Sequence, residues 1–112
     1  GMAVHRELGS GLLEALYQEA FAVELTLRGI EFEREKSYEV RYRGVRLDSR
    51  YKADFVCFGA VLVELKAVDK LIDKHRSQVI NYLKIGRLEK GLLLNFGADS
   101  LEYERFTNKS LY

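Results

Sequence analysis

The sequence predicts a mixed α+β fold in which helices flank one sheet. A helical period lies near the N-terminus, three strand-like segments follow between residues 33 and 67, and a second helical period precedes the short apolar segment 91–96. An antiparallel meander followed by a helix and a further strand is typical of a mixed sheet covered by helices. The chain has 112 residues, of which 47% are hydrophobic and 31% charged. We therefore expect a single domain spanning residues 1–112.

The first helix is predicted over residues 11–28, after a short helical turn at residues 3–8, and Gly29 is its expected end. The stripe expected to face the core consists of Leu13, Leu16, Ala20, Val23 and Leu27. An adjoining stripe consists of Glu14, Tyr17, Phe21 and Leu25. A glutamate in a first turn is stabilised by the helix dipole, so periodicity alone favours a structural role for Glu14 over a functional one.

Strands are predicted next over residues 33–42, 45–47, 51–58 and 60–67, with a turn at Arg43-Gly44 and a bulge or kink at Asp48-Ser49. The second helix is predicted over residues 70–87. Its expected core residues are Ile72, Val79, Ile80 and Leu83, and a parallel stripe carries Leu71, His75, Gln78, Tyr82 and Ile85. Residues 91–96 should form a buried strand and residues 101–106 an edge strand, and we expect the tail from Thr107 to fray.

Three charged residues, Asp54, Glu64 and Lys66, are embedded in the two most apolar strands of the chain. A three-residue turn centred on Gly59 sets Asp54 directly opposite Glu64, whereas a two-residue turn puts them on opposite faces. Opposed like charges about 5 Å apart destabilise a sheet unless a cation lies between them. From the hairpin alone, a metal site and a cluster neutralised by Lys66 or Lys52 are equally favoured.

The overall charge is only +1, so a nucleic-acid partner requires a local basic surface. Basic residues do gather between residues 41 and 52, along the predicted strands and their turn, where they form either a phosphate-binding strip or an ordinary solvated face: Arg41, Arg43, Arg46, Arg50 and Lys52. The single cysteine, Cys57, lies in an apolar strand and predicts a buried thiol in a reducing cytoplasm. No apolar segment approaches the roughly 20 residues of a membrane helix, and we expect no membrane partner.

Asp54 followed on the next strand by Glu64-Leu65-Lys66 resembles the motif of the PD-(D/E)XK nuclease superfamily, although Ala53 stands where a proline often precedes the aspartate. Residues 78–82 (Gln-Val-Ile-Asn-Tyr) resemble the Gln-xxx-Tyr motif of its RecB-like branch. Residues 11–17 (Gly-Leu-Leu-Glu-Ala-Leu-Tyr) resemble the signature of the small GxxExxY proteins. Four motifs in this order are far more specific than the acidic pair alone.

The resemblance implies a restriction-endonuclease-like core, with a helix, three antiparallel strands, a helix and a strand. It implies that Asp54, Glu64 and the carbonyl of Leu65 bind Mg²⁺ or Mn²⁺, with Glu14 as a further metal or water ligand. Lys66 would position the attacking water or steady the phosphate. Gln78 would orient active-site groups or the phosphate backbone. The residues expected to contact substrate are Tyr82, Lys52 and Arg50.

The function predicted on this basis is a metal-dependent nuclease that hydrolyses DNA phosphodiester bonds. The metal would lower the pKa of a bound water and offset charge on the scissile phosphate. The alternative is a nucleic-acid-binding or regulatory module that keeps the nuclease fold without turnover. A chain this small offers duplex DNA a narrow surface, so we expect that a homodimer would help it to engage two strands.

Overall fold

The computed structural model describes residues 1–111, and it confirms the predicted mixed α+β architecture. The elements in chain order are α1 (Met2–Leu8), α2 (Glu14–Leu27), β1 (Phe32–Tyr42), β2 (Val45–Cys57), β3 (Val61–Lys66), α3 (Asp73–Gly86), β4 (Lys90–Asn95), β5 (Glu102–Thr107) and a 3-10 helix, η1 (Lys109–Leu111). The sheet order is β1-β2-β3-β4-β5. Only the β3–β4 pair is parallel, as expected for two strands joined by a helical crossover.

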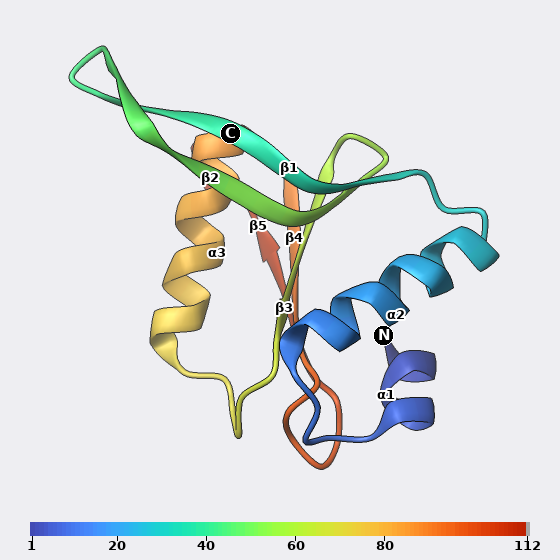
Figure 1. Cartoon of the computed structure of the whole chain (residues 1–112). Coiled ribbons are helices and arrows are strands. Elements are labelled where there is room, and N and C mark those ends of the chain that lie inside the picture. Colours follow the sequence, from blue (N-terminus) through green and yellow to red (C-terminus); the bar gives the residue numbers. More distant parts are fainter. Residues whose placement is uncertain (112) are drawn as a thin grey trace.

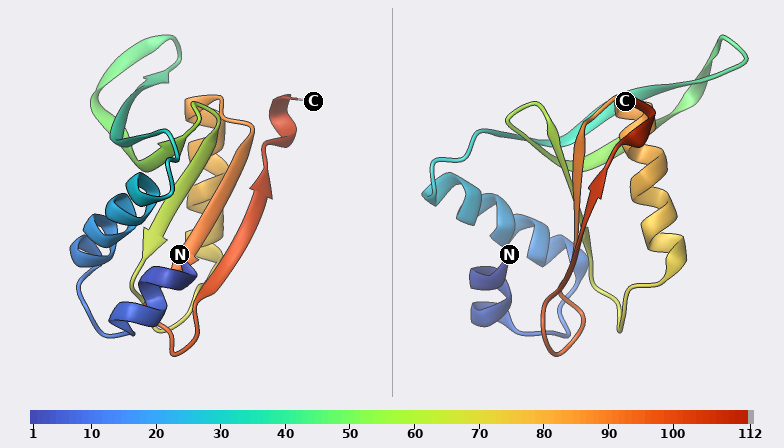
Figure 2. Two further views of the ribbon diagram at one scale, coloured as in Figure 1. Left: turned by 90° about the vertical axis from the view of Figure 1, so that its right-hand side faces the viewer. Right: turned by 180° about the vertical axis from the view of Figure 1, so that it is seen from behind.

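The sheet separates the helices into two layers. α1 and α2 lie on one face and α3 lies on the other (Figures 1 and 2). Each face has its own hydrophobic core. The core under α1 and α2 includes Tyr17, Phe21, Leu25, Phe55, Cys57, Leu65 and Phe96. The core under α3 includes Tyr51, Ala53, Val56, Leu62, Val79, Leu83 and Leu93. The central strands therefore contribute buried side chains to both layers.

The turn between β2 and β3 has the length that the sequence predicts. Phe55 pairs with Val63 and Cys57 with Val61, which leaves a three-residue connection centred on Gly59. Phe58 and Gly59 both have positive φ values, 55° and 67°, and the N–H of Ala60 donates to the carbonyl of Cys57 at 3.0 Å. The register of this turn sets the facing of every side chain on β3.

The prediction of the core-facing stripe of α2 was wrong. Leu13, Leu16, Val23 and Leu27 are exposed, while Tyr17, Phe21 and Leu25 are buried. Both stripes are apolar, so periodicity did not distinguish them, and the aromatic rings decide the outcome by filling the space above the sheet. Tyr17 stacks on Phe96 with ring centroids 4.9 Å apart, and Phe21 meets Phe55 at 5.1 Å. The helix also begins at Glu14, three residues after the predicted start.

Two predictions for the second helix and the tail were also wrong. Ile72 and Ile80 are exposed, whereas Val79 and Leu83 are buried as expected. The helix begins only at Asp73, because the N–H of Ile72 donates to Nδ1 of His75 and this bond caps its first turn. The tail does not simply fray, since the amide of Asn108 is buried and donates 3.0 Å bonds to the carbonyls of Leu83 and Leu88.

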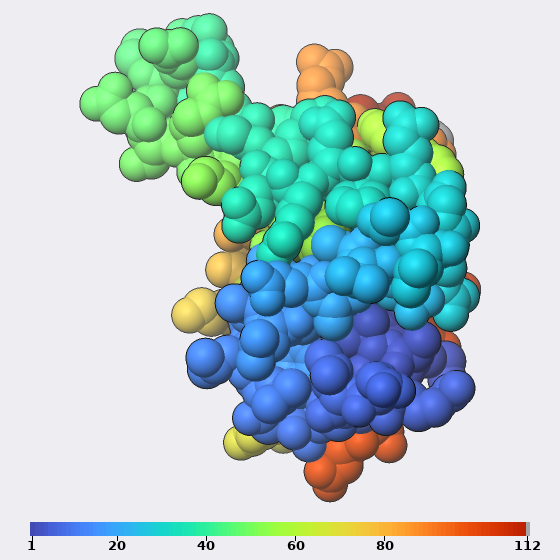
Figure 3. Space-filling model, turned by 45° about the vertical axis from the view of Figure 1, so that its right-hand side comes forward, coloured from blue at the N-terminus to red at the C-terminus, as the bar shows by residue number. Residues whose placement is uncertain are grey.

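Beyond the body of the sheet, β1 and β2 continue as a two-stranded ribbon, which we call the arm (residues 39–50). The arm projects past the end of α3 (Figure 1) and stands out from the rest of the surface (Figure 3). Every residue from 41 to 50 is exposed. The register between the strands shifts between Glu39 and Arg41, which agrees with the bulge predicted at Asp48-Ser49. No helix among the described residues is long and apolar enough to cross a membrane.

Candidate active site

The centre of the candidate site is the point where β2 and β3 separate. Backbone pairing ends at Phe55 and Val63. Immediately beyond, the N–H of Asp54 donates to Oε2 of Glu64 at 2.8 Å, and the N–H of Leu65 donates to Oδ2 of Asp54 at 2.8 Å. Each carboxylate thus satisfies a backbone donor on the opposite strand. The two side chains face each other, as the predicted turn requires.

Burial and mutual repulsion raise the proton affinity of this acidic pair. Glu64 is only 6% exposed. Burial first, and then the charge of Asp54, raises the pKa of Glu64 to about 8. Burial also raises the pKa of Asp54, while its hydrogen bond from Leu65 and the nearby Lys66 oppose that rise. A divalent cation between the two carboxylates would favour their ionised forms and so oppose both shifts.

Lys66 and Gln78 are brought together by the ends of β3 and α3. Nζ of Lys66 donates to Oε1 of Gln78 at 3.1 Å, and both side chains are half-buried. The ammonium of Lys66 lies two residues beyond Glu64 on the same side of β3. Its charge lowers the pKa of Asp54 against the effect of burial. Gln78 therefore holds the lysine beside the acidic pair.

Tyr51 is a residue of the site that the sequence did not single out. Its hydroxyl donates to Oε1 of Glu64 at 3.1 Å. Its ring stacks on that of Tyr82, with centroids 3.7 Å apart and planes inclined by 18°. Burial and the neighbouring Glu64 raise the pKa of Tyr51, which keeps the phenol in its donor form. The available signal was its position on the strand of Asp54, facing the helix that carries Tyr82.

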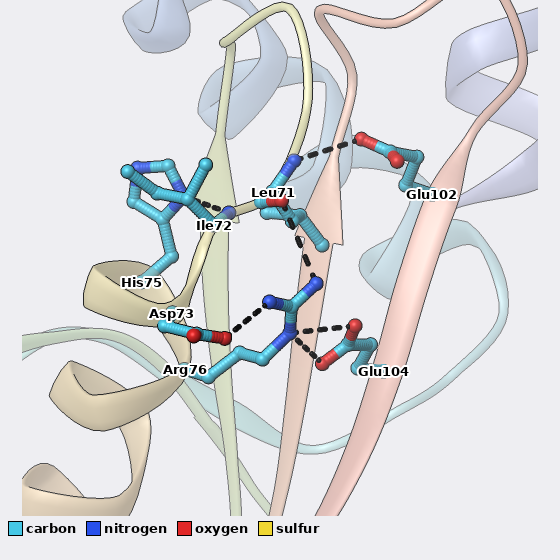
Figure 4. Close-up of polar contacts among 7 residues, drawn as sticks. All are labelled: Leu71, Ile72, Asp73, His75, Arg76, Glu102 and Glu104. Carbon is cyan, nitrogen blue, oxygen red and sulfur yellow. Dashed lines mark hydrogen bonds and ion pairs between the residues drawn. The ribbon is translucent and has the colours of Figure 1, made fainter.

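The N-terminal part of α3 is fastened to β5 by an ion pair and a backbone bond (Figure 4). Nε of Arg76 donates to both carboxylate oxygens of Glu104 at 2.8 Å, and the N–H of Leu71 donates to Glu102 at 3.1 Å. These contacts fix the helix two residues before Gln78. They hold the side-chain amide of Gln78 over the end of β3.

Glu14 begins α2 and reaches the same cavity from the opposite helix layer. Partial burial and the charge of Asp54 raise the pKa of Glu14, while Lys66 lowers it. Among residues 1–111, no three histidine, cysteine, aspartate or glutamate side chains form a group that could hold a metal ion. Glu14 therefore lies beside the acidic pair and not in a common ligand cluster with it, and its assignment as a metal ligand stays a prediction.

A cavity of about 530 Å³ connects the acidic pair with the base of the arm. Asp54, Glu64 and Lys66 line one part of it. The rest is lined by residues of the arm and its neighbours, namely Val40, Leu47, Ser49, Arg50, Tyr51, Lys52, Tyr82 and Ile85. Arg50 and Lys52 are exposed, and Nε of Arg50 donates to Oγ of Ser37 at 2.7 Å. The predicted substrate-contacting residues thus lie along one cavity wall.

Comparison with known proteins decides which family this geometry represents. A family model described as PD-(D/E)XK nuclease superfamily matches residues 1–106, almost the whole chain. The chain belongs to the PD-(D/E)XK nuclease superfamily. A search of curated proteins gives no match. Among solved structures, the one titled "Crystal structure of SSO0001" aligns with a TM-score of 0.69 and 18% sequence identity. The alignment covers 83% of this chain and 48% of that chain, so the present chain spans about half of its length.

Both comparisons agree with the restriction-endonuclease-like fold predicted for the chain. Members of the PD-(D/E)XK nuclease superfamily are usually hydrolases that act on nucleic acids, and they generally use divalent metals such as Mg²⁺.

Proposed function

We propose that this PD-(D/E)XK protein is a metal-dependent nuclease that hydrolyses DNA phosphodiester bonds. The observation that carries the proposal is a reciprocal pair of hydrogen bonds between β2 and β3. The carboxylate of Glu64 accepts from the N–H of Asp54, and the carboxylate of Asp54 accepts from the N–H of Leu65. These bonds fix two carboxylates face to face at the opening of a cavity that also contains Lys66. A purely structural pair would place a basic side chain between the acids, whereas here the lysine is bonded to Gln78.

The donor set suits Mg²⁺ or Mn²⁺. An ionised carboxylate offers about four acceptor sites, so the hydrogen bonds at Asp54 and Glu64 leave capacity for a hard cation. Asp54, Glu64 and the carbonyl of Leu65 would hold the metal through oxygen atoms, with Glu14 as a further metal or water ligand. Burial and the charge of Asp54 raise the pKa of Glu64, and a cation bound between the two carboxylates would lower it again.

When bound, the metal would supply an acidified water and stabilise charge on the phosphate. Lys66, held by Gln78, would donate to a phosphate oxygen or to the attacking water. Gln78 would thereby set the position of that ammonium. Along the cavity wall, Tyr82, Lys52 and Arg50 would contact the substrate backbone.

Three finer assignments belong to the same proposal. We assign the chain to the GxxExxY group and the RecB-like branch on the strength of residues 11–17 and of Gln78 with Tyr82. We keep a homodimer as the arrangement that lets a small chain engage two strands, and light scattering measures it directly. We keep a cytoplasmic location as a prediction from the buried thiol of Cys57.

The decisive experiment compares DNA cleavage by the wild type, Glu64→Ala and a matched control, Glu19→Ala, in Mg²⁺ and in Mn²⁺. Glu19 is an exposed glutamate of α2. We expect Glu64→Ala to lose at least 100-fold in rate, because one of the two metal-binding carboxylates is gone, and the control to keep full activity. Activity that survives in Glu64→Ala would disprove the assignment.

Calorimetry with Mn²⁺ separates the nuclease from a module that only binds nucleic acid. The nuclease proposal requires Mn²⁺ to bind the wild type and not Glu64→Ala. Salt-sensitive binding of DNA without binding of Mn²⁺ would instead establish the non-catalytic alternative.

A further inference from the structure

We infer that the arm is a duplex-binding ribbon, which grips the phosphate backbone of a double-stranded nucleic acid about six base pairs away from the acidic pair. The inference deepens the proposed function and rests on it for the direction of the substrate path. It assigns a role to the part of the arm outside the cavity, where Arg41, Arg43 and Arg46 lie, and which the chemistry at Asp54 and Glu64 does not itself require.

The first observation is the charge of the arm. Residues 39–50 contain four arginines against Glu39 and Asp48, hence a formal charge of +2, whereas the whole chain carries +1. Glu39 pairs with both Arg41 and Arg46, at 3.2 and 3.5 Å, so one acid is shared by two guanidinium groups. The arm therefore presents an excess of positive charge on a protein that is otherwise slightly acidic, which suits a polyanion.

The second observation is the geometry of the tip. Tyr42 pairs with Val45, and Arg43 and Gly44 both have positive φ values, 51° and 80°, as in the tight turns that suit a hairpin. Nη1 of Arg41 donates to the carbonyl of Gly44 at 3.0 Å, which braces the turn. Arg43 lies over the ring of Tyr42, 5.8 Å from its centroid. A two-stranded ribbon of this kind fits the major groove of B-form DNA, which is about 12 Å wide.

The third observation is continuity with the candidate active site. The cavity that contains Asp54 and Glu64 is lined at its other end by Val40, Leu47 and Arg50 of the arm. A substrate strand bound at the acidic pair would therefore leave the cavity along the ribbon. In Figures 1 and 3 the arm projects clear of the body, with its tip beyond the end of α3.

The distance between the arm and the acidic pair favours a duplex as the ligand. Asp54 lies eight residue steps along β2 from Arg46, and at about 3.3 Å per step they span roughly 25 Å, less the shortening at the bulge. One strand of B-DNA places a phosphate about every 3.4 Å along the axis, so this span equals roughly six to seven base pairs. Duplex DNA stays straight over such a length, since its persistence length is about 150 base pairs. A duplex held at the acidic pair therefore reaches the arm without bending.

The test measures binding by fluorescence anisotropy in EDTA, where metal-dependent cleavage does not contribute. The probes are a 24-base-pair duplex, a 24-nucleotide single strand and a short hairpin with about six base pairs. The variant replaces Arg41, Arg43 and Arg46 with Gln. The matched control removes the same charge from exposed positions away from the cavity, with the substitutions Arg6→Gln, Arg105→Gln and Lys109→Gln.

We expect the arm variant to bind the 24-base-pair duplex at least tenfold more weakly than the wild type. The slope of the logarithm of the binding constant against the logarithm of the salt concentration is negative. It should become less negative by about two to three, because up to three phosphate contacts are lost. The control should stay within about twofold. The short hairpin and the single strand should bind the arm variant and the wild type equally. Replacing the same three arginines with Lys should restore duplex binding, since lysine keeps the charge.

Equal losses in the arm variant and the control would overturn the inference, because net charge alone would then explain the binding. An equal loss for the single strand would overturn the selection of a duplex. A wild-type dimer that the arm substitutions convert into a monomer would assign the arm to a protein contact instead. Duplex binding through the arm in EDTA, by a protein that cleaves no DNA in Mg²⁺ or Mn²⁺, would support the inference and refute the proposed nuclease, so the two fail separately.

Discussion

The two halves of β2 form one continuous strand but differ in the burial of their side chains. Residues 51–57 lie in the centre of the sheet, and most of their side chains are buried, including Phe55 at 0% exposure. Residues 45–50 are all exposed. Residues 55–57 of the inner half pair with both β1 and β3, whereas the outer half pairs with β1 alone. Asp54 of β2 thus lies in the body of the sheet facing Glu64 of β3, whereas the charged residues of β2 in the arm are exposed.

The contrast in burial between the two halves of β2 shows how a charged residue in a strand should be interpreted. A buried carboxylate such as Glu64 must be compensated, so it points to a proton, a cation or a hydrogen-bond network. An exposed arginine such as Arg46 has no such requirement and indicates a function only through its position and its neighbours. The candidate site could be predicted from the sequence because a buried charge requires compensation. The arm could be interpreted only once the structure showed where its arginines lie.

The largest expected contrast between the halves is in stability. Phe55→Ala removes a fully buried ring from the core under α2 and should destabilise the protein by about 3–5 kcal/mol. Val45→Ala in the arm, where the side chain is 65% exposed, should change stability by less than about 0.5 kcal/mol. Urea unfolding of both variants measures the difference. Similar shifts in the two midpoints would contradict this division of the strand.

A second contrast is in the response to pH without metal. The folded-state pKa of Glu64 is raised to about 8 from an ordinary value of 4.5, so the folded state binds more protons than the unfolded state between these values. The stability from this group is complete below pH 4.5 and is lost as pH rises through 8. Relative to Glu64→Gln, the wild type should lose about 5 °C or more in Tm between pH 5 and pH 8 in EDTA.

The control for the pH experiment is Glu19→Gln on the exposed face of α2, whose melting curve should follow the wild type at both values. Addition of Mg²⁺ at pH 8 should raise the Tm of the wild type and leave Glu64→Gln unchanged, because a ligand of the folded state stabilises it. Parallel pH profiles for wild type and Glu64→Gln would rule out the raised pKa.

The smallest expected effect concerns Tyr51. Tyr51→Phe removes the donor to Oε1 of Glu64, which should cost about 1 kcal/mol and raise the pKa of Glu64 further. The pH profile of cleavage should then move to higher pH. Tyr38→Phe is the matched control. Among the described residues, the buried hydroxyl of Tyr38 finds no hydrogen-bond partner, so its removal should be neutral or stabilising. Identical pH profiles would reduce Tyr51 to a packing residue.

Much of the fold followed from local rules. The turn at Gly59, the bulge near Asp48 and the element order were all predictable, because turn parity and periodicity act over a few residues. The face of α2 was not, since its two stripes are both apolar and only the facing rings of Phe55 and Phe96 select one. Tertiary shape made that choice.

The candidate site, like the fold, could be predicted only where it depends on local rules. The pairing of Asp54 with Glu64 depends on the turn between their strands, and the structure confirms it. The bond from Tyr51 to Glu64 depends on the divergence of β2 from β3, which no local pattern encodes. The ion pair between Arg76 and Glu104, which anchors α3, joins residues 28 positions apart and was likewise invisible in the sequence.

The reciprocal hydrogen bonds of Asp54 and Glu64 also restrict how the gene encoding this chain can vary in length. Insertion or deletion of one codon between Cys57 and Val61 would shift the register of β3 by one residue. Each side chain of β3 would then point to the opposite face of the sheet, and Glu64 would no longer face Asp54. The connection can therefore lengthen only by two residues at a time. At the tip of the arm a change in hairpin length would leave Asp54 opposite Glu64, so the acidic pair places no such restriction on that turn.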